Sequence, residues 1–236
     1  LSLSAHLQYA AGCLSALVFT SSIKVLLYYF REKKKNDEVE KQRLDTELKY
    51  LKNQINPHFF FNTLNSLYGL ALDKSESTPD AILQLSSIMD YVLHGSNRKE
   101  VPVNDEIAIL ENYIALEKLR YDRRVNITFE KEGDLSNYSI APLLLLPLLE
   151  NAFKHGAQLQ ESGTTDIIIT IRMQNKCFYF SIKNTIPINV NRKLAQSGIG
   201  LENLKRRLDL LYSNFYEFSS NRDNDVFFTS LILKQN

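Results

Sequence analysis

The sequence has 236 residues, enough for one domain with an addition or for two small domains. Hydrophobic residues make up 44% and charged residues 23%, a globular composition that excludes a disordered or collagen-like chain. Lys and Arg number 28 and Asp and Glu 27, so the net charge of +1 favours no direct nucleic-acid partner. Two cysteines, Cys13 and Cys177, are too few for a disulfide scaffold or a cysteine zinc site, which favours a reducing compartment. Because the chain begins with Leu1 rather than Met, we expect a fragment.

A membrane-spanning segment is predicted over residues 1–30. No Asp, Glu, Lys or Arg occurs from Leu1 to Ile23, and a spanning helix needs about 20 apolar residues. The basic cluster over 31–35 places that side of the membrane in the cytoplasm, with the aromatic residues 28–30 at the interface. A signal peptide is disfavoured because no basic region precedes the apolar run. The alternative is a buried helix of a soluble bundle.

Residues 31–100 are predicted to form a coiled-coil connector followed by a helical hairpin. The connector carries a short heptad seam that needs a partner, most simply the same helix of a second copy. A second helix, from about Pro79 to His94, completes the hairpin, and two hairpins would make a four-helix bundle in a dimer. A linker helix is expected over 101–124. The seam consists of Leu44, Leu48, Leu51 and Ile55.

The first hairpin helix carries the motif QINPHFFFNTLNS over residues 54–66. Pro57 should kink the helix because it removes a backbone donor and clashes with the preceding turn. His58 and Asn62 are four residues apart and share a face. From the residues alone, a histidine here is more often structural than reactive.

Residues 125–236 are predicted to form an α+β sandwich, with helices on one face of a mixed sheet. Strand patterns alternate with two helical segments, and a turn is expected at 174–176. The expected strands are Val125–Glu130, Asp166–Met173, Phe178–Lys183 and Val226–Lys234, and the expected helices are Pro142–His155 and Gly198–Tyr212.

Two segments of this domain carry candidate chemistry. In the first, Asn151, Lys154 and His155 fall on one helical face, which suits a metal-chelated phosphate. The alternative is an ordinary helix end, with Gly156 in the left-handed conformation. In the second, SGIGL over 197–201 opens a helix, where glycines let backbone N–H groups approach a phosphate. Most such glycine pairs are simple turns.

Together, the segments LKNQINPHFFFNTLNSL, LLLLPLLENAFKHG and SGIGLENLKRRLDLLY resemble the LytS/YehU-type sensor histidine kinases, as does ENYIALEKLRYDRR between them. The resemblance covers about Lys49 to the C-terminus. It implies a membrane sensor with a dimeric helical hairpin and a Bergerat-fold (GHKL) ATP-binding domain. It also implies ATP and Mg²⁺ as cofactors, a homodimer in the bacterial cytoplasmic (inner) membrane with its catalytic part in the cytoplasm, and a response regulator, such as one of the LytTR type, as partner.

The resemblance also assigns roles to single residues. His58 matches the phosphoacceptor that attacks the γ-phosphate, and Asn62 would orient it or a water. Asn151 matches the asparagine that ligates Mg²⁺, with Glu150 beside it as a further catalytic candidate. Lys154 and His155 would face the phosphates. The glycine box over the triphosphate is matched by Gly198, Gly200, Leu201 and Asn203.

The sequence departs from the pattern of the wider histidine kinases at two positions. Phe59 stands where many of them have an acidic residue after the phosphoacceptor, so a more distant group takes the proton or neutral imidazole attacks unaided. The adenine box Asp-x-Gly-x-Gly is missing, and Asn184 is the best match for its aspartate. Its side-chain oxygen can still accept a hydrogen bond from the adenine amino group, without charge. Residues 186–197 would be the mobile lid over ATP.

The leading hypothesis is an ATP-dependent histidine autokinase that passes phosphate to an aspartate of a response regulator. One alternative is a catalytically silent nucleotide-binding partner that acts through dimerisation. Another is a GHKL ATPase that hydrolyses ATP to drive a conformational change, but this leaves the Pro57–His58 motif unexplained. Phosphate on His58 separates the first hypothesis from the second.

Overall fold

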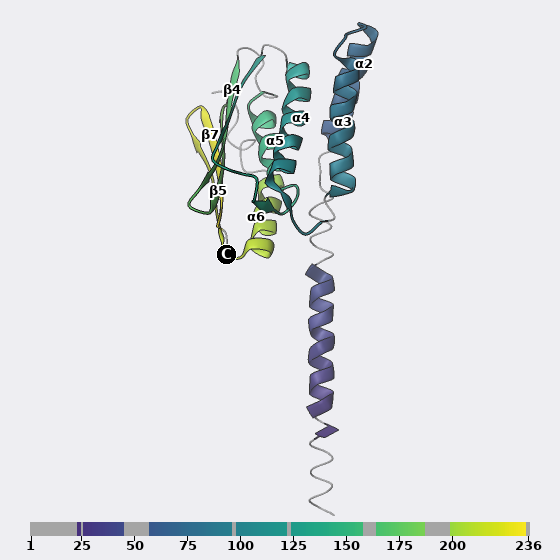
Figure 1. Cartoon of the computed structure of the whole chain (residues 1–236), viewed down its shortest axis with the longest axis vertical. Helices are drawn as coiled ribbons and strands as arrows, with labels where there is room; N and C mark the ends of the chain where they lie inside the picture. The colour runs from purple at the N-terminus through teal and green to yellow at the C-terminus, as the bar shows by residue number, and fades with distance from the viewer. Residues whose placement is uncertain are drawn as a thin grey trace, which may run out of the picture. The chain divides into compact units, whose positions relative to one another are not determined.

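The computed structural model describes residues 23–24, 26–44, 57–95, 98–121, 124–157, 164–186 and 199–234, with only the backbone at 57, 58 and 199. The chain divides into two units, Leu1–Tyr50 and Leu51–Asn236. Figure 1 shows a helical N-terminal region followed by a sheet with helices on one face.

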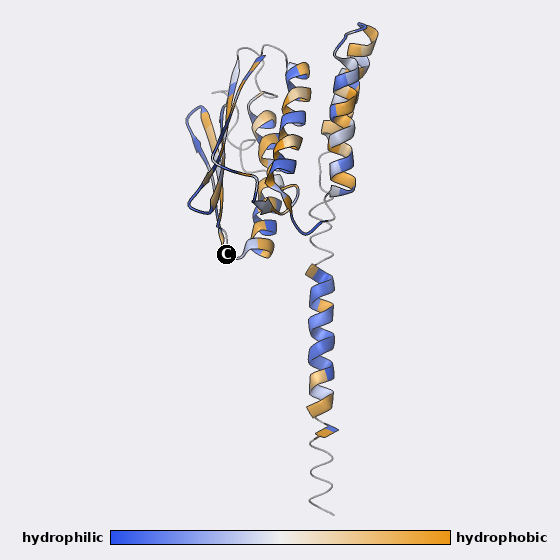
Figure 2. Cartoon of the chain, viewed as in Figure 1, coloured by the Kyte–Doolittle hydropathy of each residue, from blue (hydrophilic) through white to orange (hydrophobic). Residues whose placement is uncertain are grey.

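The described part of the first unit is a helix over 26–44 whose side chains are almost all exposed. It is hydrophilic along most of its length and hydrophobic at its start (Figure 2). Among the residues that the structure describes, no helix combines the length and apolar character needed to cross a bilayer. Most of the predicted membrane segment, residues 1–22 and 25, lies outside the described residues, as does the heptad seam beyond Leu44.

The second unit begins with a helical hairpin that packs on a third helix. Helices α2 (Pro57–Leu72) and α3 (Thr78–Leu93) form the hairpin, and α4 (Val103–Tyr121) follows. Both α2 and α3 contact α4. Because α2 begins at Pro57, the predicted kink falls at the boundary with residues 45–56, which lie outside the described part of the chain.

A five-stranded mixed sheet forms the other layer, in the order β2-β4-β5-β7-β6. Strands β2 and β4 are parallel, and the other pairs are antiparallel. A separate two-stranded pair joins β1 (Val101–Pro102) to β3 (Ser139–Ile140). The five strands are β2 (Val125–Glu132), β4 (Thr165–Gln174), β5 (Cys177–Thr185), β6 (Tyr216–Asp223) and β7 (Val226–Lys234).

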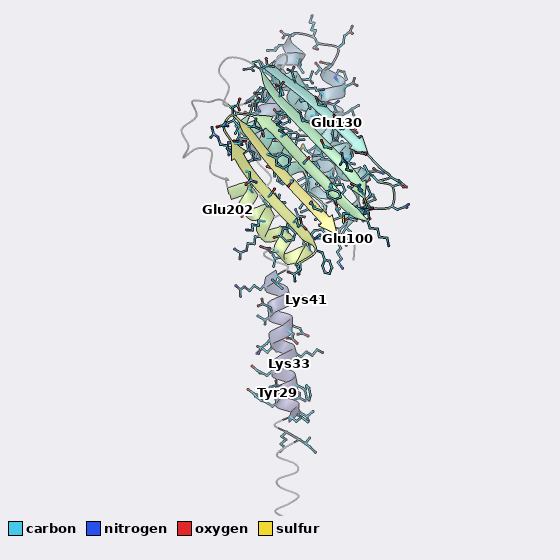
Figure 3. The ribbon with its side chains drawn as sticks, turned by 90° about the vertical axis from the view of Figure 1, so that its left-hand side faces the viewer. Tyr29, Lys33, Lys41, Glu100, Glu130 and Glu202 are labelled. Carbon is cyan, nitrogen blue, oxygen red and sulfur yellow. The ribbon has the colours of Figure 1, made fainter. Side chains whose placement is uncertain are left out.

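The hydrophobic core lies between this sheet and α4, α5 (Leu146–His155) and α6 (Ile199–Tyr212), which cover one face (Figure 1). In β4, Ile167, Ile169 and Ile171 are fully buried, while the residues between them point to the other face. That outer face is seen in Figure 3, with its strands side by side and the helices behind them. The predicted α+β sandwich is therefore confirmed.

The helix predicted from Pro142 begins only at Leu146, so that part of the prediction is wrong. The backbone N–H groups of residues 143–145 all donate to the carboxylate of Glu106 in α4. Leu143 also has a positive φ of 58°, which no α-helix allows. The apolar sequence favours a helix here, but hydrogen bonds to Glu106 hold residues 143–145 in a non-helical turn.

Candidate functional site

Helix α5 carries four of the predicted site residues near its C-terminal end. Its apolar residues are buried, whereas Asn151 and His155 are half-buried and Lys154 is exposed. Lys154 and His155 lie in the last turn, where the ammonium group of Lys154 complements the helix dipole. The helix therefore presents an amide, an ammonium and an imidazole beyond the packed core.

Gly156 ends α5 for a reason of packing. Its φ is −88°, so the left-handed helix end considered as an alternative is not formed. A Cβ at this position would lie 2.7 Å from Cγ2 of Thr165 and 3.1 Å from the carbonyl oxygen of Thr185. The glycine thus lets the end of α5 approach β4 and β5 closely.

Asn184 near the end of β5 presents an unused acceptor. The residue is 1% exposed, and its Nδ2 donates to the carbonyl oxygen of Thr185 at 3.2 Å. Its Oδ1 is buried and has no hydrogen-bond partner. Because the Nδ2 bond sets the orientation of the amide, Oδ1 is left as the unsatisfied acceptor, and a buried acceptor without a partner is costly.

His155 lies next to a row of three residues that are paired across neighbouring strands, Asn184, Phe227 and Arg222. Phe227 of β7 pairs with Asn184 of β5 on one side and with Arg222 of β6 on the other. The ring centroids of His155 and Phe227 are 6.5 Å apart. Nδ1 of His155 and Nη1 of Arg222 are both buried without a hydrogen-bond partner. Three unsatisfied polar groups therefore surround Phe227.

The imidazole of His155 is electrostatically disposed to be neutral. Burial lowers its pKa, and the positive charges of Lys154 and Arg222 lower it further. A neutral imidazole has one donor and one acceptor nitrogen and packs readily against a planar ring.

Glu150 lies at the interface of α5 with α4, beside Glu117. Burial raises the pKa of both carboxyls to about 7, and the charge of Glu117 adds to the increase at Glu150. Oε2 of Glu117 and Oε1 of Glu150 are buried without hydrogen-bond partners. Arg120 offsets part of this cost, with its Nη1 3.6 Å from Oε1 of Glu117. The pair therefore holds protons at a higher pH than ordinary glutamates do.

The start of α6 carries three of the residues predicted for the glycine box. Gly200 is exposed and a Cβ there would meet no atom within 4 Å, while Leu201 is buried and Asn203 half-buried. Gly198 and residues 187–197 of the lid predicted over 186–197 lie outside the described residues. The packing of α6 on α5 places the beginning of α6 in the same layer as the phosphate candidates.

The phosphoacceptor candidate lies on α2, one residue after its start. The side chain of His58 is outside the described part of the chain. Asn62 is half-buried one turn later, and its carbonyl oxygen accepts a hydrogen bond from Ser66 Oγ at 3.1 Å. The described residues thus bring together α5, β5 and α6 but do not place the imidazole of His58 against them.

Sequence reasoning missed Glu106, Glu117 and Arg222. For the two glutamates a signal existed, because they fall on the buried stripe of α4 among apolar residues at helical spacing. A charged residue on such a stripe is unusual and indicates a specific partner. Arg222 gave no local signal, since β6 was not predicted.

The donor set suits a nucleotide better than a free metal ion. Among the described residues, no group of three His, Cys, Asp or Glu side chains could hold a metal. The unpartnered Oδ1 of Asn184 suits an amino donor such as that of adenine. A single amide at Asn151 suits Mg²⁺ only with further oxygen ligands, such as phosphates and waters.

Comparison with known proteins gives consistent matches. A family model described as "Histidine kinase" matches residues 46–125. "Sensor protein LytS" of Staphylococcus saprophyticus is 32% identical over 186 residues, covering 74% of this chain and 31% of that protein. "Sensor histidine kinase/phosphatase LytS" of Staphylococcus aureus is 30% identical over 79% of this chain and 34% of that protein. The catalytic domain of histidine kinase ThkA has 15% identity and a TM-score of 0.42, over 57% of this chain and 93% of that one. The chain thus spans about a third of the length of the curated relatives it matches.

Proposed function

Because the chain belongs to the LytS-type sensor histidine kinase family, we propose that it is the kinase part of a two-component sensor. In this function the chain binds ATP and transfers its γ-phosphate to His58. The phosphate then passes to an aspartate of a cognate response regulator. A regulator of the LytTR type is the partner that we expect.

The observation that carries the proposal is the unsatisfied acceptor of Asn184 beside the end of α5. Adenine presents an amino donor on its edge, which would satisfy Oδ1 without a charge. His155 and Phe227, whose ring centroids are 6.5 Å apart, would flank the base. The arrangement therefore supports a Bergerat-type nucleotide site in which asparagine replaces aspartate.

The triphosphate would extend from the base towards Lys154, Asn151 and the start of α6. Lys154 is exposed and supplies a point charge, and Gly200 leaves backbone N–H groups open to phosphate oxygens. A Mg²⁺ ion held by Asn151 and the phosphates would neutralise charge on the transferring group. Gly198, Leu201 and Asn203 would complete the closing loop and helix.

Phosphoryl transfer requires that a ring nitrogen of His58 forms a bond to the γ-phosphorus while the bond to the bridging oxygen breaks and ADP leaves. The ring proton must leave as well. Phe59 offers no base, whereas Glu150 has a pKa raised to about 7 by burial, which suits proton exchange at neutral pH. Asn62, one turn after His58, would orient the imidazole or a water.

The hairpin would also provide a homodimer interface. Large apolar side chains remain exposed at helical spacing on both of its helices, and a contiguous apolar surface indicates a partner. Two such hairpins would bury these faces in a four-helix bundle. In the membrane-anchored protein, the segment before the helix over 26–44 would place the kinase on the cytoplasmic side. The exposed residues are Phe61, Leu64, Tyr68 and Leu72 in α2, and Ile82, Leu83, Met89 and Leu93 in α3.

The test is incubation of the whole chain with γ-labelled ATP and Mg²⁺, beside a His58→Gln control. Label that is acid-labile and alkali-stable, and present only in the wild type, supports the proposal. Label that persists in His58→Gln contradicts the assignment of His58. Binding of ATP without label favours the silent nucleotide-binding partner, for which the uncharged Asn184 is the specific observation.

A further inference from the structure

One buried carboxylate joins elements from both halves of the second unit. Glu106 in α4 is 2% exposed, and its Oε1 lies 2.5 Å from the hydroxyl of Tyr91 in α3. The same Oε1 lies 2.5 Å from the backbone nitrogen of Leu143. Its Oε2 accepts from the N–H groups of Leu144 at 3.1 Å and Leu145 at 3.2 Å. The carboxylate therefore binds both the hairpin and the segment that begins α5.

The same segment is held from its other side by α6. Arg207 donates from Nη1 to the carbonyl oxygen of Leu143 at 2.9 Å, and from Nη2 to that of Pro142. Arg207 is buried, and Leu143 keeps a φ of 58° that costs conformational energy in a branched residue. The turn over 142–145 thus depends on contacts from α4 and α6, and it determines where α5 starts.

The hairpin reaches α4 at a second point. The ring of Phe59 in α2 stacks on that of Tyr113 in α4, with centroids 4.5 Å apart. Tyr113 in turn meets Phe153 of α5 edge-on, with centroids 5.7 Å apart. Two of the contacts that dock the hairpin on α4, at Glu106 and at Tyr113, therefore continue into α5.

We propose that Glu106 is a positioning residue through which docking of the hairpin on α4 sets the start of α5, and with it the nucleotide site. This inference rests on the proposed function for the identity of that site. When the hairpin is docked, the Tyr91 hydroxyl satisfies Oε1 and the carboxylate holds the turn over 142–145. When the hairpin leaves, the buried carboxylate loses a donor, and the turn loses part of its anchor.

The energetics favour coupling between docking of the hairpin and binding of the nucleotide. A buried carboxyl group that loses one hydrogen-bond partner stays desolvated without compensation, which costs more than the hydrogen bond itself contributes. Docking and nucleotide binding then assist each other by the same factor, because coupling between two binding equilibria is reciprocal. This coupling would link the hairpin to helix α5, which carries Asn151, through α4.

The test is hydrogen–deuterium exchange on the whole chain, comparing wild type with Tyr91→Phe. This variant keeps the ring and removes only the hydroxyl. We expect the amides of residues 143–145 to exchange about fivefold faster or more, and ATP to bind more weakly by a similar factor. Tyr179→Phe is the matched control, because Tyr179 lies on the outer face of β5, on the side of the sheet away from the helices. Unchanged exchange at 143–145 in Tyr91→Phe would overturn the proposal.

Two further measurements separate coupling from simple destabilisation. Amides of the interior strand β4 should exchange alike in wild type and Tyr91→Phe, and faster exchange there would mean general loosening of the fold and would overturn the proposal. In a Phe59→Leu background, docking is already weakened. Tyr91→Phe should therefore increase the exchange rates at residues 143–145 by a smaller factor there than in the wild type. An undiminished effect would contradict action through docking. The exchange readout uses no phosphorylation, so failure of the proposed kinase activity remains a distinguishable result.

Discussion

The ring of Phe59 stacks on that of Tyr113 at an interplanar angle of 26°. Phe59 directly follows His58, so the residue after the phosphoacceptor candidate serves as a packing anchor on α4. This position therefore contributes apolar contact where many of the wider histidine kinases are expected to have a carboxylate. The neighbouring aromatic residue Phe61 behaves differently, because it is 68% exposed.

Replacing Phe59 or Phe61 by alanine should affect different properties of the chain. We expect Phe59→Ala to lower the free energy of unfolding by about 3–5 kcal/mol, since it removes a buried ring and leaves a cavity. Phe61→Ala should change that free energy by less than about 0.5 kcal/mol and should weaken self-association instead. Urea denaturation and sedimentation measure the two effects. Equal loss of stability in both variants would contradict the packing described here.

Asn184 should control which base the chain accepts. We expect Asn184→Ala to weaken ATP binding about tenfold, the effect of a hydrogen bond of about 1.4 kcal/mol. Guanine presents a carbonyl oxygen where adenine has its amino group, so the preference for ATP over GTP should also fall. Calorimetric titration with both nucleotides measures this, with the exposed Asn221→Ala as control. An unchanged ratio of affinities would remove Asn184 from the base site.

Gly156 and Gly69 form a matched pair for testing the close approach of α5 to the sheet. At Gly156 an added Cβ would meet Thr165 at 2.7 Å, whereas at Gly69 in α2 it would meet nothing within 4 Å. We expect Gly156→Ala to cost about 1–3 kcal/mol of stability and to weaken nucleotide binding. Gly69→Ala should stabilise the chain by about 0.5–1 kcal/mol, because alanine favours the helix. Thermal denaturation of both variants decides the point, and a stabilising Gly156→Ala would refute the packing role.

The buried carboxyl of Glu117 predicts an unusual pH dependence. Its pKa is about 7 in the folded chain against 4.5 in the unfolded one, so the folded state binds more protons between these values. Stability from this group is therefore complete below about pH 4.5 and is lost as the pH rises through about 7. Glu117→Gln should be on the order of 1–3 kcal/mol more stable than wild type at pH 8 and similar at pH 4.5.

Denaturant unfolding at a series of pH values measures this difference. The control is Glu202→Gln, which alters an exposed glutamate at the start of α6 (Figure 3). This control should follow the wild-type profile throughout. A Glu117→Gln variant that kept the full pH dependence of the wild type would show that other groups cause it.

Much of the fold was predictable because local chemistry agrees with it. The turn predicted at 174–176 forms with positive φ at Asn175 and Lys176, and the strand predicted at Val226–Lys234 has those bounds. Strand β6 was missed because Tyr216–Asp223 alternates weakly and is mostly polar. The prediction that a helix begins at Pro142 is wrong for a different reason. The carboxyl group of Glu106, 37 positions before Leu143, accepts hydrogen bonds from the N–H groups of residues 143–145. Local patterns carry no information about such a contact.

Some residues of the candidate site can be predicted from the sequence, and others can be found only from the folded structure. Asn151, Lys154 and His155 were identifiable because they share one helical face and a motif, and Asn184 because it ends a strand next to the expected box. The pairing of Glu150 with Glu117 and the place of Arg222 beside Phe227 depend on how α4 and β6 pack. Only the assembled sheet and helices bring those residues into range.

Strand β7 lies between β5 and β6 in the sheet, although it follows both in the chain. During synthesis, the edge of β5 that pairs with β7 therefore remains unpaired until the residues from Val226 onward have been added. Phe227, the row partner of Asn184, arrives on that late strand. The hairpin of α2 and α3 emerges long before it and can meet a neighbouring nascent chain. In the proposed dimer, the order of synthesis would therefore let two hairpins associate before the proposed nucleotide site is complete.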